Sequence, residues 1–457
     1  MKIVIIGAGI SGCTAYLLLK KHLPKPLSAE PHSITIYEAH DTDKDTTSSD
    51  RGHGATHSST LVVGGGLGVG ANGLHVLKRL DEDILLDVVR GGYVVPTMMM
   101  KSKNGTVLAR LQPTGSPLSG DGSAANDMCM VATSRHSLWR CLRLRIPDSA
   151  IVTKRVAKVT ANPDGRNLVS FVDGSPPVEA DLVLGADGLK SLTKHALFPE
   201  ADQDPFPARY EGLVGVGGFI PSSDVKGHVE KGSMNFVFGG NGFFGYFFAE
   251  KPGKSLAWWS TFTANECPTP GTLDVEAVTH QLRERHQDWK DPVVQKVLRS
   301  LRVDNMYPTW TVPPLPTWER EGVVLVGDAA HALPPTSGQG SSQALEDVEA
   351  FALFLGHYLR KAYQEHKIYD ANSRKQVIKV AAKQYMELRL PRVTKILQEA
   401  QTMQNSKRDM TVFQEYLMYI FLWILGCFPG FMSKSLAGVV RYNVAEEAKK
   451  VLGKADS

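Results

Sequence analysis

The sequence predicts an α/β fold in which a first domain is interrupted by an inserted antiparallel β-sheet and followed by a helical C-terminus. Lys2–Ile6 is a short β-branched run that leads through glycines into helical periodicity, as expected of a strand in a parallel sheet. Alternating and aromatic stretches separated by turns then occupy residues 206–312, and Val323–Val326 restores the first pattern. We therefore expect one discontinuous domain over 1–205 and 313–375, a β-sheet domain over 206–312, and a helical region over 376–457.

The composition is that of an ordinary globular enzyme and excludes several other classes of protein. The 457 residues carry a formal net charge of +4 without a block of Lys and Arg, so nucleic acid is not an expected partner. The five cysteines are scattered without CxxC spacing, which argues against disulfides and a zinc site, and we expect no metal and a cytoplasmic location. These cysteines are Cys13, Cys129, Cys141, Cys267 and Cys427.

The first motif is a GxGxxG sequence placed directly between a strand and a helix. Gly7 permits the tight turn, Gly9 lets the backbone approach a pyrophosphate, and Gly12 allows close packing of the helix on the strand. The helix predicted over Ser11–Lys21 offers free N–H groups at its start to phosphate oxygens. The apolar run Lys2–Ile6 is interpreted as a buried strand rather than a signal peptide, because glycines interrupt it and no cleavage site follows.

A second strand, predicted over Ile34–Tyr37, ends in an acidic residue. Glu38 follows it directly, and a carboxylate at that place can accept hydrogen bonds from both ribose hydroxyls of an adenosine. A glycine-rich turn without a ligand is the plainer interpretation of GxGxxG alone. The strand, turn, helix and acidic strand end together predict a Rossmann-type dinucleotide-binding domain.

Two further strand ends carry acidic residues beside glycines. The strand that starts near Asp181 leads to Asp187-Gly188, and the strand Val323–Val326 leads to Gly327-Asp328. Asp328 can hydrogen-bond a polyol hydroxyl. The chain then passes through Gly338 and Gly340 to a helix that begins near Ser341, whose first N–H groups could face the negative edge of a reduced flavin ring.

These motifs, in this order and spacing, resemble the class A FAD-dependent monooxygenases of the para-hydroxybenzoate hydroxylase type. The resemblance covers essentially the whole chain and implies a glutathione-reductase-like FAD-binding domain with an inserted substrate domain. It implies that Glu38 binds the adenine ribose, Asp328 the ribityl chain, and Gly338–Ser341 the isoalloxazine. It assigns non-covalent FAD binding to Gly7, Gly9, Gly12, Glu38, Gly66, Arg135, Asp187, Gly327, Asp328, Gly338, Gly340 and Ser341.

Arg135 and Gly66 enter this set through the resemblance alone. Arg135 begins a predicted helix, as a family arginine that contacts FAD does, and a surface arginine is the plainer alternative. Gly66 belongs to a glycine-rich segment similar to the family's flavin-side loop. The segment Arg441–Val444 also resembles the closing segment of the family.

The sequence departs from the family pattern in ways that bear on the substrate. Lys190 stands where Arg usually follows the Asp-Gly motif, and Val216–Ile220 lacks the Arg that many fungal phenol hydroxylases carry there. Gly242–Phe247, with Trp258 and Trp259 downstream, is closer to the urate-hydroxylase and epoxidase branches. A small aromatic or apolar organic substrate is therefore favoured.

The resemblance implies that NAD(P)H reduces the flavin and that O₂ then supplies one oxygen atom, through a flavin hydroperoxide, for hydroxylation or epoxidation. Tyr246 is the candidate catalytic side chain in the substrate cavity, with plain packing in a sheet as its alternative. At most one of Trp258 and Trp259 can face the cavity, because they are neighbours on a strand. A reductase or dehydrogenase on the same fold is the alternative function, and a non-catalytic flavin-fold protein is a further one.

A stretch near the C-terminus, residues 416–433, carries no formal charge. Its length is near the lower limit for a membrane span, and Gly426, Pro429 and Gly430 weaken it as a helix. Packing against the rest of the protein or a second copy is the default expectation. Peripheral contact with a membrane is the alternative that a lipophilic substrate would favour.

Overall fold

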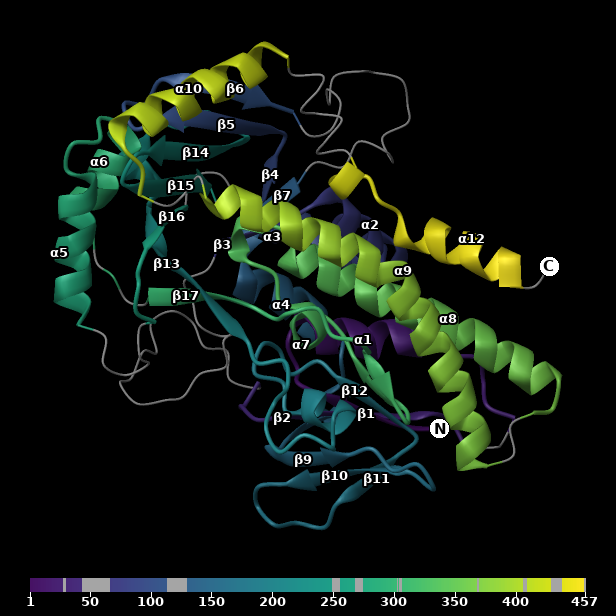
Figure 1. The fold of residues 1–457 in the computed structure, drawn as a ribbon. Helices are drawn as coiled ribbons and strands as arrows, with labels where there is room; N and C mark the ends of the chain where they lie inside the picture. The colour runs from purple at the N-terminus through teal and green to yellow at the C-terminus, as the bar shows by residue number, and fades with distance from the viewer. Residues whose placement is uncertain are drawn as a thin grey trace, which may run out of the picture.

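The protein has two large sheets, and helices cover them (Figure 1). The computed structural model describes residues 1–27, 30–42, 66–112, 130–248, 255–267, 274–301, 303, 306–367, 370–405, 409–428 and 438–455. The segment Val63–Gly65, which precedes Gly66, lies outside them.

The first sheet is the parallel sheet of the discontinuous domain. Its order is β18-β19-β12-β1-β2-β8, parallel throughout except for β18. The three central strands are apolar and almost fully buried, because helices cover the sheet. The strands are β1 (Lys2–Ile6), β2 (Ser33–Glu38), β8 (Ile151–Thr153), β12 (Leu182–Gly185), β18 (Glu319–Arg320) and β19 (Val323–Leu325).

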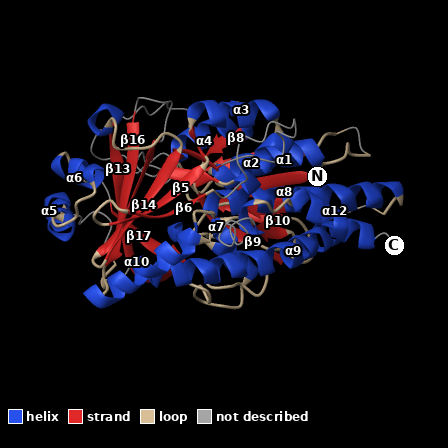
Figure 2. Cartoon of the chain, turned by 90° about the horizontal axis from the view of Figure 1, so that it is seen from above, coloured by secondary structure: helices blue, strands red, loops and turns tan. Residues whose placement is uncertain are grey.

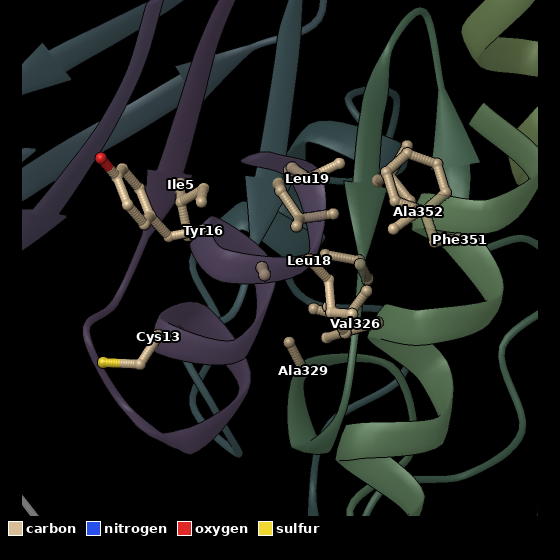
Figure 3. Close-up of a cluster of buried hydrophobic side chains, with 14 of the residues drawn as sticks. Ile5, Cys13, Tyr16, Leu18, Leu19, Val326, Ala329, Phe351 and Ala352 are labelled. Carbon is tan, nitrogen blue, oxygen red and sulfur yellow. The ribbon is translucent and has the colours of Figure 1, made fainter. Parts of the chain in front are cut away.

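Helices α1 (Ile10–His22) and α8 (Gly340–Gln364) pack together against this sheet and form its core. Leu18 of α1 lies beside Val326, which follows β19, and Phe351 of α8 completes the contact (Figure 3). A small antiparallel sheet belongs to the same domain, lies between β8 and β12 in sequence, and consists of β9 (Val156–Thr160), β10 (Asn167–Phe171) and β11 (Val178–Ala180). The expected strand–helix–strand unit is confirmed.

The second sheet is the inserted one, and it is larger than the sequence predicted. Its seven strands run β17-β13-β16-β15-β14-β5-β6, antiparallel except for the parallel pair β14 and β5. Two of these strands precede residue 206, so the boundary drawn there is wrong for this sheet. The strands are β5 (Thr97–Ser102), β6 (Val107–Leu111), β13 (Arg209–Pro221), β14 (Ser233–Gly239), β15 (Gly242–Phe248), β16 (Ser255–Thr263) and β17 (Met306–Thr311).

Two helices that the sequence did not predict, α5 (Val275–His286) and α6 (Pro292–Arg299), cover one face of the second sheet (Figure 2). A third sheet has three strands in the order β3-β7-β4. Its strands are β3 (Gly66–Val69), β4 (Tyr93–Val95) and β7 (Met130–Ser134). The helices beside it are α2 (Ala71–Leu80), α3 (Glu82–Gly91) and α4 (Arg135–Arg143).

The C-terminal part is helical, as expected, although α9 begins at Ala371, before residue 376. The helices are α9 (Ala371–Asn405), α10 (Val412–Cys427) and α12 (Val444–Ala455). Helix α9 runs along α8, and α10 lies over β6 at the edge of the second sheet (Figure 1). Within the part of the chain that the structure describes, no helix is both long enough and apolar enough to cross a membrane.

Candidate active site

Four motifs meet at one edge of the parallel sheet. Strands β2, β1, β12 and β19 are neighbours in that order, and Ile6 pairs with Tyr37 on one side and Gly185 on the other. Parallel strands end at the same edge, so the residues that follow them lie side by side. The GxGxxG turn, Glu38, the Asp-Gly turn and the Gly-Asp turn therefore converge, as the sequence predicted.

The GxGxxG turn is held by contacts that only glycines allow. Gly7 has φ +98°, and a Cβ there would lie 2.6 Å from the carbonyl oxygen of Ala186. A Cβ on Gly12 would collide with the carbonyl oxygen of Gly7, so the helix can approach the turn only without a side chain. Gly9 is the N-cap residue of α1 and provides no side-chain cap. The turn thus leaves the first N–H groups of α1 available.

Glu38 lies against this turn. Its Oε2 accepts a hydrogen bond from the Ala8 N–H at 2.7 Å, and its Oε1 accepts one from the His40 N–H at 3.0 Å. The side chain is buried, which fixes its place beside the turn. Each carboxylate oxygen can accept a second hydrogen bond, so the group can still bind a hydroxyl.

The two aspartates at the neighbouring strand ends differ in what they contact. Asp187 accepts hydrogen bonds from Ser191 Oγ at 2.6 Å and from the Thr193 N–H and Oγ1 at 3.0 and 2.9 Å. Burial raises the pKa of Asp187 against the effect of these bonds. Asp328 is half-buried, and its carboxylate has no hydrogen-bond or ion-pair partner among the described residues. Asp187 therefore holds its own turn, whereas Asp328 is available to a ligand.

The segment from Gly338 to Ser341 joins the Gly-Asp turn to α8. Gly338 has φ +59°, and a Cβ on Gly338 or Gly340 would find no atom within 4 Å, so open space adjoins both glycines. Ser341 Oγ lies 3.5 Å from the carbonyl oxygen of Gly68. Helix α8, like α1, has no side-chain cap at its start, whereas α3, α5, α6 and α10 are capped by an Asp or Thr side chain.

Gly66 and Arg135 lie at the junction with the second sheet. Gly66 pairs with Ser134, so Arg135, the first residue of α4, is close to it. Arg135 is exposed. A Cβ on Gly66 would lie 2.5 Å from the ring of Phe247 in β15. The glycine-rich strand β3 thus contacts the second sheet directly.

The face of the second sheet that Gly66 contacts is aromatic. Trp259 contacts the rings of Phe236, Phe243 and Phe247, with ring centroids 5.7–6.1 Å apart. Trp258 lies on the opposite face, stacked on Phe244 at 5.6 Å. The two tryptophans therefore face opposite sides, as predicted from their adjacency.

Tyr246 lies on the same face as Trp258, away from Gly66, and is fully buried beneath α5 and α6. Its hydroxyl accepts a hydrogen bond from Lys101 Nζ at 2.8 Å and donates one to Asp291 at 3.1 Å. Asp291 also caps α6. Burial, together with Asp291, raises the pKa of Tyr246. This geometry favours the packing alternative: Tyr246 anchors α6 to the sheet and does not face the side where Gly66 lies.

Sequence reasoning did not identify a buried group of charged and polar residues behind the Gly-Asp turn. Three acids close together in a largely apolar helical run, Glu346, Asp347 and Glu349, were the available signal, because buried acids require partners. Its members are Asn72, Gln339, Gln343, Glu346, Asp347, Arg389 and Arg392, of which all but Arg392 are buried.

The edge of the sheet has the donors and acceptors that a dinucleotide requires: uncapped N–H groups at α1, a carboxylate at Glu38, and a free carboxylate at Asp328 beside open space. The fold and this site define an FAD-binding oxidoreductase. The model of the family described as "FAD binding domain" matches residues 153–384, and the chain belongs to that family. FAD is its cofactor.

Curated relatives agree with this class. The FAD-dependent monooxygenase OpS4 of Beauveria bassiana (strain ARSEF 2860) is 25% identical over 415 residues, covering 88% of this chain and 84% of its own length. The chloroplastic zeaxanthin epoxidase of Oryza sativa subsp. japonica is 24% identical over 373 residues, covering 80% of this chain and 49% of its own length. The chain thus spans about half the length of that epoxidase. The protein is an FAD-dependent monooxygenase.

Solved structures share the fold. Klebsiella pneumoniae HpxO, complexed with FAD and uric acid, superposes with a TM-score of 0.70 at 21% identity and covers 95% of this chain and 96% of its own. A salicylate hydroxylase substrate complex superposes with a TM-score of 0.69 at 19% identity and covers 98% and 97%.

Proposed function

We propose that the enzyme transfers one oxygen atom from O₂ to a small apolar or aromatic substrate, with NAD(P)H as a transient reductant. The observation that carries this proposal is the contact between Gly66 and Phe247, which brings the aromatic face of the second sheet against the glycine-rich strand of the flavin domain. When bound, FAD supplies the electron transfer and oxygen activation. The chain's own residues bind, orient and shield the substrate.

The cofactor-binding residues are proposed as follows. The N–H groups at the start of α1 bind the pyrophosphate, Glu38 accepts hydrogen bonds from the adenine ribose, and Asp328 accepts them from the ribityl chain. Arg135 is exposed at the start of α4 and supplies a positive charge near Gly66. Gly338, Gly340 and Ser341 lie beside the isoalloxazine because open space adjoins both glycines. Asp187 supports this site by holding the Asp-Gly turn.

The side chains on the aromatic face favour an uncharged substrate. Phe236, Phe243, Phe247 and Trp259 carry no charge and would desolvate a ligand without compensating an anionic group. Burial of rings and aliphatic carbons against them supplies the binding free energy. We infer hydroxylation or epoxidation of a lipophilic or neutral aromatic compound, in preference to a benzoate.

Absorbance near 450 nm of the purified protein and NADPH or NADH oxidation with candidate substrates would test this function. Coupled formation of an oxygenated product supports it; reduction of the substrate without O₂ would instead make the protein a reductase. The substrate class is tested by Trp259→Leu, which is expected to raise KM for apolar substrates at an unchanged FAD spectrum. Trp258→Leu on the opposite face is the matched control and should leave KM unchanged while lowering stability. Equal effects on KM would contradict the assignment of the face.

We also propose peripheral membrane contact through α10. Its buried residues are Glu415 and Leu422, which face the rest of the protein. Large apolar side chains are exposed around much of its remaining circumference, and an exposed apolar patch of this kind marks an interaction surface for a membrane or a protein. Those at least 45% exposed are Val412, Phe413, Tyr416, Leu417, Ile420, Phe421, Trp423, Ile424 and Phe428.

A further inference from the structure

A buried ionic cluster links three helices behind the proposed flavin position. Arg389 and Arg392 come from α9, Glu346 and Asp347 from α8, and Asn72 from α2. The side chains of Arg389, Glu346 and Asp347 are fully inaccessible to solvent. A charge group buried this deeply is costly unless every member is paired, so its arrangement is tightly specified.

Arg389 is the centre of the cluster. Its Nε donates to Asp347 Oδ1 at 2.9 Å, one terminal nitrogen pairs with Glu346, and the other donates to Gln343 Oε1 at 2.5 Å. Burial opposes the charge of Arg389, but the two carboxylates outweigh it and raise its pKa. The planar guanidinium thus holds two adjacent acids and an amide in one fixed geometry.

One branch of the cluster leads to the Gly-Asp turn. The second oxygen of Asp347 accepts the Gly327 N–H at 3.0 Å and contacts His331 Nε2 at 2.5 Å. Gly327 has φ +61° and directly precedes Asp328. Asp347 therefore fixes both ends of the short helix α7 (Asp328–His331), and Arg389 fixes Asp347.

The other branch leads to the loop before α8. Asn72 Nδ2 donates to Glu346 Oε1 at 2.5 Å and to Gln339 Oε1 at 3.0 Å. Gln339 lies between Gly338 and Gly340. Arg392 secures the same carboxylate with bonds of 2.8 and 2.9 Å to Glu346. Arg392 in turn lies 3.9 Å from the ring of Tyr442, in the C-terminal segment.

We propose that Arg389 is a positioning residue for FAD, which sets the distance between the Gly-Asp turn and the Gly338–Gly340 loop through Asp347 and Glu346. This inference rests on the proposed function, because it takes the cofactor to lie against those two segments. Its specific content is that the cluster acts on the flavin site and not only on stability.

The test uses two conservative variants that each replace a guanidinium fork by a single ammonium. Arg389→Lys is expected to weaken FAD binding about tenfold, the effect of losing one well-placed hydrogen bond on each branch, and to shift the flavin midpoint potential and visible spectrum. Arg79→Lys is the matched control. Arg79 of α2 binds the buried Glu349 of α8, the helix that also carries Glu346 and Asp347, at 2.7 and 2.6 Å. This ion pair involves neither the Gly-Asp turn nor the Gly338–Gly340 loop.

Asn72→Ala is a third variant and weakens the branch to Gln339: Glu346 keeps both arginines, and Gln339 keeps only the 3.3 Å hydrogen bond from Gln343 Nε2. It is expected to weaken FAD binding in the same direction, and it carries the test by itself if Arg389→Lys does not fold. FAD affinity is measured by flavin fluorescence and stability by thermal unfolding of the apoprotein. Affinity, spectrum and potential equal to those of the parent, or an equal loss in Arg79→Lys, would overturn the inference. A parent chain that takes up no FAD would instead refute the proposed function.

Discussion

At the scale of single residues, the structure separates two aspartates that the sequence motifs present as equivalents. Asp187 satisfies three donors of its own turn, whereas Asp328 has no partner among the described residues. A carboxylate that accepts the donors of its own turn stabilises that turn, whereas a free carboxylate can accept hydrogen bonds from a ligand. The motif predicted their place at the sheet edge but not this division, because hydrogen-bond partners depend on loop geometry.

Asp328→Asn is expected to raise the FAD dissociation constant about tenfold to a hundredfold, the usual effect of losing charge-assisted hydrogen bonds. The melting temperature of the apoprotein should not change, since the carboxylate of Asp328 bonds to no group among the described residues. Asp187→Ala is the counterpart and should lower the apoprotein melting temperature, because Thr193 and Ser191 lose their acceptor. Fluorescence titration and thermal unfolding measure the two effects. A reversed ranking would contradict the assigned roles.

Residue-scale prediction was weakest for Tyr246. The segment Gly242–Phe248 is apolar or glycine at nearly every position. It therefore has no alternation of polar and apolar residues that would show which side chains face the flavin domain. Tyr246 lies on the face of the sheet that α5 and α6 cover, and the sequence analysis had not identified these two helices.

At the scale of elements, strands and helices with a strong local signal were predicted within a few residues, as for α1, β2 and α8. Strands β5 and β6 were not assigned to the second sheet. The pairing of β5 with β14 joins segments more than a hundred residues apart and leaves no mark in the local pattern, and β6 enters the sheet only by pairing with β5. The cluster around Arg389 was missed for a related reason: charges on a helix are normally solvated, and only the packing of α9 on α8 buries them.

The packing of α5 on the second sheet predicts a pH dependence. Burial, reinforced by Arg285, lowers the pKa of His286 from 6.5 to about 3, and the neutral ring contacts Ser260 Oγ at 2.9 Å. Between these two pKa values, only the unfolded chain binds a proton at His286. The contribution of His286 to the free energy of unfolding is therefore complete above pH 6.5 and decreases as the pH falls, by about 1.4 kcal/mol per pH unit.

His286→Gln is therefore expected to reduce the slope of unfolding free energy against pH between about 6.5 and 4 in denaturant titrations. His280→Gln, at an exposed position of the same helix, is the control and should keep the parent slope. If the two variants show the same slope, His286 is not the group that titrates.

At the scale of the whole molecule, the two sheets are brought together by segments from distant parts of the chain. Strand β3 contacts β15 through Gly66 and Phe247. Helix α9 packs along α8, and α10, the next helix in the chain, packs on β6 of the second sheet. Sequence reasoning recovered the sheet edge at which FAD binding is proposed, because each strand end carries its own motif. It could not recover the relation between the domains, which depends on surface complementarity without a residue signature.

The uncovered surface of α10 yields the last prediction. Full burial of one large apolar side chain contributes about 1.5–3 kcal/mol, so even shallow insertion of several would bind the protein to a lipid surface. The parent chain is expected to co-sediment with phosphatidylcholine vesicles. A variant with Phe413→Ser, Phe421→Ser and Trp423→Ser should remain in the supernatant at unchanged thermal stability, because all three side chains are more than half exposed.

Leu144→Ser with Val172→Ser is the control for this vesicle test, since both residues are exposed apolar side chains away from α10. That variant should sediment like the parent chain. Light scattering without vesicles distinguishes lipid from a second copy of the chain. If the α10 substitutions convert a dimer to a monomer while vesicle binding is absent in the parent, the exposed side chains form a protein interface. Apolar substrates would then have to reach the aromatic face from solution rather than from a lipid phase.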